Sequence, residues 1–446
     1  MALTGLEIYK LLPKKNCGKC GPPTCLAFAM QLAANKGSLD QCPDVTEEAK
    51  AALGAASAPP IRKVAIGEGD RQLVVGDETV LFRHDKTFFH ETGIAIQVPD
   101  TASVDEIRSR VEALNKLEFE RVGMMLRPNL VAVNNLSRDP EKFAAAVKVA
   151  AETSKMPLMI MTTDVAAMDK AVAAAAARKP LMCGANAENL DGMVEIAKKH
   201  GLPMVLSAKG LDDLAALSDK VTAAGHKEII LDPGCREVGG CLEDLTNMRR
   251  MAIRKKFRPL GFPTVAFIEE DDPVQAAADA SVYIAKYASI IVFKSIETWQ
   301  LLPLITLRQN IYTDPQKPIQ VEAKVYEIGE VKPNSPVFIT TNFSLTYFTV
   351  VGDIEVSKTP AYLLVVETDG TSVLTAWAAG KFTADKIAEH MQKFDVAGKV
   401  NHKKIILPGY VAVLSGKLSD LSGWEILVGP RESAGIPSFL KARWTA

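Results

Sequence analysis

Four cysteines lie close together near the start of the chain. Cys17, Cys20 and Cys25 occur in the run CGKCGPPTC, and Cys42 follows alone after 16 further residues. Thiolate sulfurs clustered in this way are ligands for metal ions and for iron–sulfur clusters. The pattern C-x2-C-x4-C-x16-C therefore predicts a metal centre, and electron transfer is the first function that it indicates.

The spacing of these cysteines distinguishes between kinds of metal centre. A structural zinc site takes its ligands as two close pairs, whereas here three cysteines stand together and one is distant. This arrangement favours a [4Fe-4S] cluster, with zinc as the alternative. Gly18 and Gly21 allow the backbone torsions of a cluster-binding loop, and amphipathic helices are expected on either side, at 4–13 and 26–37.

Neither export nor membrane insertion is indicated. The first residues contain no apolar segment of the signal-peptide type, and no uninterrupted apolar run reaches the length of a membrane span. We therefore expect a cytoplasmic protein with no membrane partner, in which a disulfide framework is disfavoured. The formal net charge of −1 arises from interspersed charges of both signs, which argues against a nucleic-acid partner.

The 446 residues suffice for several domains. Small residues and prolines at 53–60 (LGAASAPP) are typical of a linker, so we expect a cluster domain at residues 1–57. The following segment, to about Glu91, alternates apolar and polar residues like an antiparallel hairpin. A second proline-containing connection at 311–318 separates a central domain (58–315) from a C-terminal domain (316–446).

In the central domain, short apolar runs alternate with helical patterns. Asp139 and Asp164 are expected to cap the starts of two of these helices. Eight strand–helix units over about two hundred residues predict a TIM barrel, with an open doubly wound sheet as the alternative. The expected strands are 94–98, 130–134, 158–162, 181–183, 204–206, 229–231, 264–267 and 290–293.

The carboxyl ends of barrel strands are where such folds carry function, and here they are polar. Asp232 is one of these rim residues, but no combination of side chains identifies a reaction, so a rim that caps helices and contacts partners is favoured. Cys235 and Cys241 are expected to be unpaired, unreactive thiols. The pairs His84–Asp85 and His90–Glu91 are expected to be structural polar groups and not metal ligands.

In the C-terminal domain, three expected strands run into loops of small and hydroxyl-bearing residues, at 341–346, 368–373 and 430–435. In an open α/β sheet such loops gather in one crevice beyond the carboxyl edge, where backbone amides and helix N-termini receive a polar or phosphate-bearing ligand. No Walker A or G-x-G-x-x-G sequence is present, so an ordinary nucleotide is not supported.

These features occur together in one known family. Over its whole length the chain resembles the large subunits of corrinoid iron–sulfur proteins of the reductive acetyl-CoA pathway. The stretches that carry the resemblance are LTGLEIYKLLPKKNCGKCGPPTCLAFAMQLA, LFRHDKTFFHETGIAIQV, RQNIYTDPQKPI, NSPVFITTNFSLTY and GWEILVGPRESAGI.

The resemblance implies the cofactors and their ligands. The four N-terminal cysteines would hold a [4Fe-4S] cluster, and a Rossmann-like C-terminal domain would hold a cobalamin-type corrinoid by its nucleotide tail. A small barrel subunit would complete the corrinoid pocket as a heterodimer partner. The implied corrinoid contacts are Thr340, Thr346, Gly370, Thr371, Ser372, Val373 and, in the turn 429–435, Ser433.

The implied function is that of a methyl carrier, a methyltransferase component without a catalytic side chain of its own. Its cobalt(I) would accept a methyl group from methyltetrahydrofolate, delivered by a separate methyltransferase, and pass it to the nickel site of acetyl-CoA synthase. The D-x-H-x-x-G motif of methionine-synthase-type domains is absent, since Asp369-Gly370 is followed by Thr371. The corrinoid is therefore expected base-off and without a protein histidine, with the cluster reducing Co(II) when it forms.

Three other functions stay open. The first is an electron-transfer protein that reduces a different corrinoid protein and holds no corrinoid itself. The second is a barrel that binds a pterin at its polar rim and catalyses methyl transfer. The third is a scaffold stabilised by zinc.

Overall fold

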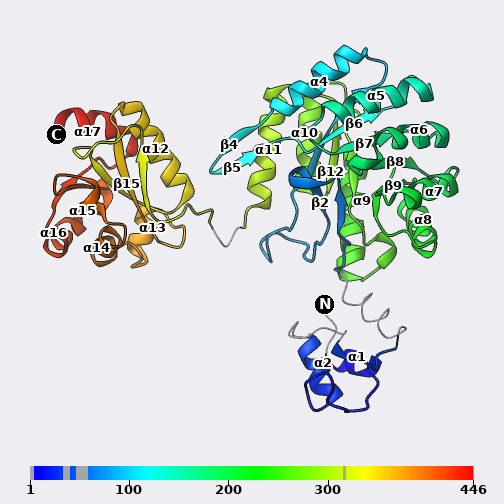
Figure 1. Ribbon diagram of the computed structural model, residues 1–446, viewed down its shortest axis with the longest axis horizontal. Helices are drawn as coiled ribbons and strands as arrows, with labels where there is room; N and C mark the ends of the chain where they lie inside the picture. Colours follow the sequence, from blue (N-terminus) through cyan, green and yellow to red (C-terminus); the bar gives the residue numbers. More distant parts are fainter. Residues whose placement is uncertain (1–4, 34–40, 47–58, 315–317, 445–446) are drawn as a thin grey trace. The chain divides into compact units, whose positions relative to one another are not determined.

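The computed structural model describes residues 5–33, 41–46, 59–314 and 318–444 (Figure 1). Most of the linker expected at 53–60 lies outside these residues, as do the expected domain boundaries at residues 57 and 315. The described residues form a cysteine region, a parallel barrel and a C-terminal sheet. None of the described helices combines the length and the apolar character required to cross a membrane.

The cysteine region contains two short helices that pack against each other. Helix α1 (Gly5–Leu11) and helix α2 (Cys25–Ala33) confirm the two helices expected beside the cysteine loop. They approach closely at Gly5, where a Cβ atom would lie 2.4 Å from the Met30 sulfur. Their shared core contains Ile8, Leu12 and the fully buried Phe28.

Eight parallel strands form a nearly closed barrel, as the sequence predicts. Neighbouring strands follow the order β10-β9-β8-β7-β6-β3-β12-β11. Leu231 joins the two ends of this sheet, because it pairs with Thr264 and its N–H donates to the Pro263 carbonyl at 2.8 Å. The open doubly wound alternative is therefore wrong. The strands are β3 (Gly93–Pro99), β6 (Leu130–Asn134), β7 (Leu158–Met161), β8 (Leu181–Ala185), β9 (Met204–Ser207), β10 (Ile229–Asp232), β11 (Val265–Phe267) and β12 (Ile290–Phe293).

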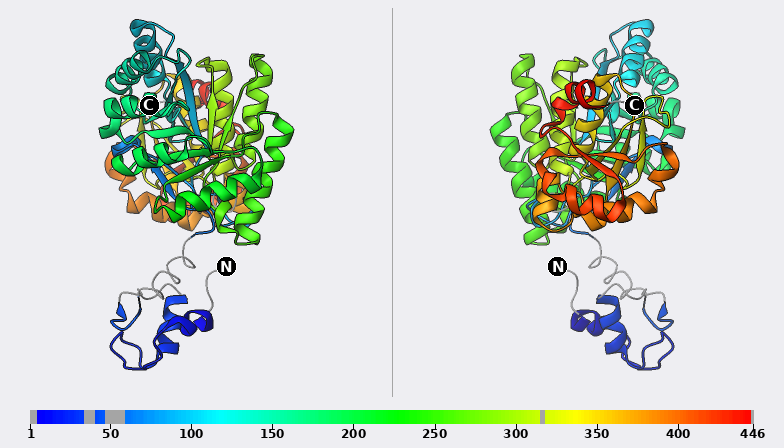
Figure 2. Two further views of the ribbon diagram at one scale, coloured as in Figure 1. Left: turned by 90° about the vertical axis from the view of Figure 1, so that its right-hand side faces the viewer. Right: turned by 90° about the vertical axis from the view of Figure 1, so that its left-hand side faces the viewer.

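Helices follow the strands and form the outer layer of the barrel (Figure 2). Asp139 and Asp164 cap two of them as expected, and each carboxylate accepts hydrogen bonds from two backbone N–H groups of the first turn. Such caps satisfy donors that a helix start otherwise leaves unpaired. The helices are α5 (Pro140–Thr153), α6 (Val165–Ala175), α7 (Leu190–His200), α8 (Leu211–Ala223), α9 (Val238–Arg254) and α10 (Pro273–Ala285).

A short antiparallel hairpin, β1 (Val64–Ile66) and β2 (Leu73–Val75), packs into the barrel core from the amino-terminal side. The sequence predicts a hairpin that continues to about Glu91, but no strand is present in residues 76–91, so this part of the prediction is wrong. Gly76 redirects the chain with a φ of +98°, and a Cβ there would lie 2.0 Å from the Arg62 carbonyl oxygen. The buried Arg249 then holds the next segment, since it pairs with Glu78 at 3.0 Å.

The segments before β3 and β6 also contact helix α11 (Thr298–Tyr312). The buried Arg308 pairs with Glu91 at 3.2 Å and donates to the Arg127 carbonyl at 3.0 Å. Glu91 therefore has a structural partner. His84 and Asp85 lie 3.7 Å apart on the surface. Between β3 and β6 run α4 (Val104–Lys116) and the hairpin of β4 (Phe119–Arg121) and β5 (Met124–Leu126).

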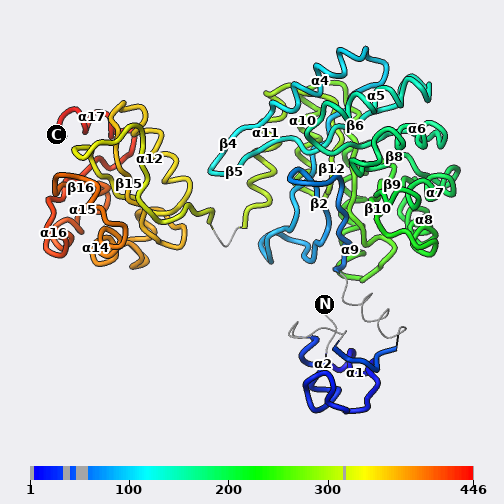
Figure 3. The backbone as a smooth tube through the Cα atoms, in the orientation of Figure 1, coloured from blue at the N-terminus to red at the C-terminus, as the bar shows by residue number. Residues whose placement is uncertain are grey.

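The C-terminal region is an open five-stranded sheet, whose chain path Figure 3 traces from yellow to red. Its strands are β13 (Val325–Ile328), β14 (Val337–Thr341), β15 (Ala361–Val366), β16 (Lys404–Leu407) and β17 (Glu425–Val428). The order is β13-β15-β14-β16-β17, and only the edge strand β13 is antiparallel to its neighbour. The strand order reverses between β14 and β16, which is where ligands bind in sheets of this kind.

Helices cover both faces of this sheet. On one face, Ile354 of α12 (Ser344–Ser357) and Leu440 of α17 (Ile436–Arg443) share a core with the strands. On the other face, Met391 of α14 (Ala384–Lys393) and Leu418 of α16 (Ser415–Ser422) do the same, and Ala376 of α13 (Val373–Ala378) joins them. The polar loops at the carboxyl edge are thus held by a sheet with a core on each face.

Candidate functional site

The four N-terminal cysteines surround the start of helix α2. Cys25 and Cys42 are buried and Cys20 is half-buried, all three within the core of the cysteine region, whereas Cys17 is exposed. Asn16 ties the loop to the helix, because its side-chain oxygen accepts a hydrogen bond from the Cys25 N–H at 2.8 Å. The Asn16 N–H in turn points to the Cys25 sulfur at 3.4 Å. The fold thus places three of the predicted ligands against one apolar core.

The pKa of the Cys20 thiol reflects the crowding of the four cysteines. Burial raises the pKa of the Cys20 thiol, and the charges of Cys42, Cys17 and Cys25 raise it further. Thiolates that repel one another at short range are stabilised when they share a metal centre. Gly18 and Gly21 adopt the left-handed torsions expected of the loop, with φ of +70° and +103°.

The described residues contain no group of three or more His, Cys, Asp or Glu side chains placed to hold one metal ion. Three thiols against an apolar core, with the exposed Cys17 as the fourth, are a donor set of the kind that binds an iron–sulfur cluster through one thiolate for each iron.

A cavity of about 390 Å³ lies at the carboxyl edge of the C-terminal sheet. It opens at the point between β14 and β16 where the strand order reverses. Five of the seven residues proposed from the sequence line it: Thr340, Thr346, Ser372, Val373 and Ser433. Loops that are up to 93 residues apart in the sequence therefore meet around one hollow.

Thr340, the last residue but one of β14, has a hydroxyl without a partner. Its side chain is 1% exposed, and its Oγ1 forms no hydrogen bond with any other described residue. A buried hydroxyl in this condition costs about 1–3 kcal/mol. Since Thr340 lines the cavity, a ligand with a polar group there would satisfy the hydroxyl.

Gly370 and Thr371 do not line the cavity but form the turn that leads to it. The Asn342 side-chain oxygen accepts hydrogen bonds from the N–H groups of Thr368 (2.9 Å) and Gly370 (3.0 Å). Thr371 closes the turn, because its hydroxyl donates to the Thr368 carbonyl at 2.7 Å. The turn places Ser372 and α13 at the cavity wall. The contact of Gly370 and Thr371 with a ligand stays a prediction.

Asn342, Tyr410 and Glu432 are site residues that the sequence analysis missed. Asn342 is fully buried and organises the turn from the neighbouring strand. The Tyr410 hydroxyl donates to the Glu432 carboxylate, which joins the loops after β16 and β17 at the cavity. The turn signal Pro408-Gly409 after a strand could have pointed to the Tyr410 loop, but nothing in the sequence pairs Tyr410 with Glu432.

Neither histidine of the C-terminal region lines the cavity. Nδ1 of His390 lies 2.9 Å from the Lys386 carbonyl, and its Nε2 accepts from the Glu367 N–H at 3.3 Å. Nε2 of His402 lies 2.9 Å from the Ser335 carbonyl, and its Nδ1 accepts from the Lys404 N–H. Both rings therefore have both nitrogens engaged by the backbone.

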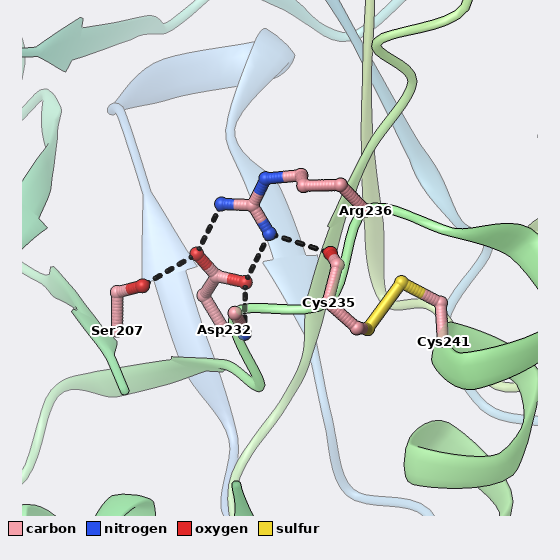
Figure 4. Close-up of a disulfide and its surroundings, with 6 residues drawn as sticks. Ser207, Asp232, Cys235, Arg236 and Cys241 are labelled. Atoms are coloured by element: carbon pink, nitrogen blue, oxygen red, sulfur yellow. Dashed lines mark hydrogen bonds and ion pairs between the residues drawn. A yellow bond between two sulfur atoms is a disulfide. The ribbon is translucent and has the colours of Figure 1, made fainter. Parts of the chain in front are cut away.

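The polar rim of the barrel is internally paired around Asp232 (Figure 4). This buried carboxylate accepts from the Ser207 hydroxyl at 2.8 Å and from two nitrogens of Arg236 at 2.9 and 3.0 Å. Beside it, Cys235 and Cys241 form a disulfide, so the expectation of two unpaired thiols is wrong. The loop brings their Cα atoms to 5.3 Å, within the range that a disulfide requires.

The barrel, the open C-terminal sheet with its cavity and the four clustered cysteines define a class of protein: a multidomain α/β protein with a thiol-rich N-terminal region. A family model described as "CO dehydrogenase/acetyl-CoA synthase delta subunit" matches residues 63–440, and a model described as "Putative Fe-S cluster" matches residues 12–43. The chain is 52% identical to the corrinoid/iron-sulfur protein large subunit of Moorella thermoacetica over 99% of both chains.

More distant relatives extend the match. The acetyl-CoA decarbonylase/synthase complex subunit gamma of Methanothermobacter thermautotrophicus is 36% identical over 99% of both chains. A structure of Yersinia pestis dihydropteroate synthase matches 49% of this chain and 93% of its own, at 14% identity and a TM-score of 0.36, which is too remote to bear on function. The chain belongs to the family of corrinoid/iron-sulfur protein large subunits and acetyl-CoA decarbonylase/synthase gamma subunits.

Proposed function

We propose that this protein is the methyl-carrying subunit of acetyl-CoA synthesis. It receives a methyl group from methyltetrahydrofolate through a separate methyltransferase and delivers it to the nickel site of acetyl-CoA synthase. The observation that carries the proposal is the cavity at the strand-order reversal, with the unpartnered Thr340 hydroxyl in its wall. Membership of the corrinoid/iron-sulfur family supports a corrinoid as the ligand.

The C-terminal sheet would act as a Rossmann-like corrinoid-binding domain. Thr340, Thr346 and Ser433 present hydroxyls to the cavity, and Ser372 and Val373 form its wall at the start of α13. When bound, the corrinoid supplies a cobalt centre that carries the methyl group, and the [4Fe-4S] cluster supplies the electron that restores oxidised cobalt. The residues of this chain hold and orient both groups.

The engaged histidines support a corrinoid without a protein imidazole. His390 and His402 each use both ring nitrogens within the fold, and neither lies in the cavity wall. An axial nitrogen donor stabilises Co(II) against reduction, so its omission raises the Co(II)/Co(I) potential, by 59 mV for each factor of about ten in the equilibrium constant. This shift brings cobalt closer to the range of a low-potential cluster.

A partner subunit would cover the mouth of the cavity. Leu345 and Leu374 line the cavity yet are 56% and 44% exposed, and Trp377 and Val413 lie exposed on the α13 and η5 (Gly409–Leu414) segments. Large apolar side chains grouped at a ligand site are typical of a protein interface. The small barrel subunit implied by the family fits this role.

A pair of matched variants tests the cavity. Thr340→Val removes an unpartnered buried hydroxyl from a residue that lines the cavity, whereas Thr341→Val removes an equally unpartnered one from a neighbour that does not line it. We expect T340V to weaken corrinoid binding by about 1 kcal/mol, or roughly fivefold in Kd, and T341V to leave it unchanged. The measurement is corrinoid titration of anaerobic heterodimer, followed by its absorption spectrum.

The same preparation separates the alternative functions. We expect iron and cobalt together in the wild-type heterodimer. A protein that contained iron and could not be loaded with corrinoid would instead be an electron-transfer protein. Equal effects of T340V and T341V on corrinoid affinity would show that the cavity is not the corrinoid-binding site.

Replacement of one cysteine tests the role of the cluster. Cys20→Ala should lower the iron content and abolish reductive reactivation, because one thiolate ligand is lost. Methyl transfer from protein reduced beforehand should persist, because transfer of a methyl cation needs no net electron. Equal loss of both activities would contradict this division of roles.

A further inference from the structure

The disulfide at the barrel rim has no part in the proposed methyl-carrier function. Cys235 lies in the loop after β10, and Cys241 lies in the first turn of α9, with Gly239 and Gly240 between them (Figure 4). The bond closes a ring of seven residues at the carboxyl end of the barrel strands, the end at which barrels of this type place their functional loops.

The two cysteines differ in exposure. Cys241 is 1% exposed and is one of the buried residues of α9, whereas Cys235 is half-buried in the loop. An incoming thiolate therefore reaches the Cys235 sulfur first. Thiol–disulfide exchange depends on which sulfur is accessible and on how well the other sulfur leaves as an anion.

The N-terminus of α9 offsets part of the cost of releasing the buried Cys241 sulfur as a thiolate. Helix α9 has 17 residues, and the partial positive charge at its N-terminus stabilises an anion in the first turn. The first turn carries no acidic side chain, and Glu237 at the N-cap is exposed to water. Attack on Cys235 thus releases the sulfur that the helix stabilises.

The disulfide also links the β10 side of this loop directly to the start of α9. On the β10 side, Arg236 is held by its two hydrogen bonds to Asp232 and by contact with the Phe267 ring at 4.6 Å. On the α9 side, Gly239 and Gly240 have no neighbouring atom within 4 Å of the position that a Cβ would occupy. The loop forms part of the wall of a rim cavity of about 860 Å³, which Gly234 and Arg236 line together with Ser207.

We propose that Cys235 and Cys241 form a reversible thiol–disulfide exchange site that locks the β10–α9 loop at the mouth of the barrel. A thiolate of a low-molecular-mass dithiol attacks the Cys235 sulfur, the Cys235–Cys241 bond breaks, and Cys241 leaves as a thiolate. The second sulfur of the dithiol displaces Cys235 and closes to a disulfide, so that two electrons pass to the protein and the two thiol protons pass to the cysteines or to water. A low-molecular-mass disulfide reverses the step.

Trypsin provides a direct readout, because it cleaves after Arg236, between the two cysteines. The native full-length protein is equilibrated with mixtures of reduced and oxidised dithiothreitol, alkylated, denatured and digested. Peptides 228–236 and 237–249 are joined in the oxidised form and separately alkylated in the reduced form. We expect their ratio to follow the redox mixture in both directions. A linked pair that survives excess reduced dithiothreitol, or that never forms, would overturn the proposal.

Cys183 is the internal control for this experiment. It is buried in the barrel away from the disulfide, and burial raises the pKa of its thiol, so its slow alkylation in native protein should not change between the reduced and oxidised mixtures. Labelling of Cys183 together with the rim pair would mean that the barrel unfolds, and would overturn local exchange.

Two single variants test the asymmetry. Alkylation of Cys241 in the Cys235→Ser variant should be about tenfold slower than alkylation of Cys235 in the Cys241→Ser variant, because Cys235 is the more accessible of the two thiols. Equal rates would contradict the proposed order of attack.

Amide hydrogen exchange tests whether the disulfide restrains the β10–α9 loop. Reduction should speed exchange at residues 237–241, including the Cys241 N–H that bonds to the Glu237 carbonyl, and leave β10 unchanged. An identical exchange pattern in both redox forms would show that the bond restrains nothing.

Discussion

The barrel rim and the carboxyl edge of the C-terminal sheet are built alike but treat their polar groups differently. Both are ends of parallel strands, and both present buried polar side chains. At the rim, Asp232 is satisfied by Ser207, Gly234 and Arg236. At the sheet edge, the Thr340 hydroxyl has no partner among the described residues, and Thr340 is one of the residues that line a cavity. A strand end that satisfies its own polar groups is a structural site, whereas one that leaves them unpaired is suited to a ligand.

The largest expected effect on the free energy of unfolding is at the barrel rim, where the polar groups have partners. Asp232→Ala leaves Arg236 and Ser207 without their shared partner. We expect a loss of about 3 kcal/mol in the free energy of unfolding, at the lower end for a broken buried ion pair because Arg236 keeps part of its surface in water. Chemical denaturation measures this loss, and Ser207→Ala, which removes one neutral hydrogen bond, should cost only about 1 kcal/mol.

Corrinoid affinity is the second measurement on the Asp232→Ala protein. Because the rim is satisfied internally, the affinity should not change. Weaker corrinoid binding with an unchanged free energy of unfolding would show that the barrel rim, and not the edge of the C-terminal sheet, contributes to the ligand site.

An intermediate effect is expected at the sheet edge from Asn342→Ala. Loss of Asn342 removes the acceptor for Thr368 and Gly370, so the turn before Ser372 loses its support. We expect the free energy of unfolding to fall by about 2 kcal/mol and corrinoid affinity to fall with it. Gln320→Ala, which removes a single hydrogen bond to Asn342, is the matched control and should change both quantities little. A stable N342A protein with normal affinity would show that the turn does not position the cavity wall.

The smallest expected effect is a dependence on pH that both regions share. Burial lowers the pKa of His390 in the C-terminal sheet and of His226 in the barrel below the ordinary value of 6.5. Below about pH 6.5 the two histidines are protonated more readily in the unfolded chain than in the folded one. The free energy of unfolding therefore decreases as the pH is lowered, by up to about 1.4 kcal/mol per pH unit for each group. Above that pH neither group contributes.

Two substitutions separate these pH effects. His390→Gln should flatten the pH dependence of hydrogen exchange in the C-terminal sheet only, and His226→Gln should flatten that in the barrel only. If either variant leaves the pH dependence of its own region unaltered, the buried ring is not the group that titrates.

Much of the fold could be predicted from the sequence. The eight barrel strands and the caps at Asp139 and Asp164 depend on patterns within a few residues, and all are present. The hairpin prediction failed beyond Val75, because alternation in that segment reflects side chains held by Arg249 and Arg308 and not strand pairing. The disulfide was not predicted, because a separation of six residues in the sequence does not determine whether a glycine-containing loop brings the two cysteines together.

The sequence by itself determined where strands, helices and clustered thiols occur, since these follow from local periodicity, capping and spacing. Only the tertiary structure decided which polar groups at strand ends have partners. The Asp232 carboxylate is hydrogen-bonded to Ser207 on a neighbouring strand, whereas the Thr340 hydroxyl has no partner in the part of the chain that the structure describes, although both are polar residues at the ends of apolar strands. Hydrogen-bond satisfaction depends on atoms brought together from distant parts of the chain, and no local pattern records that.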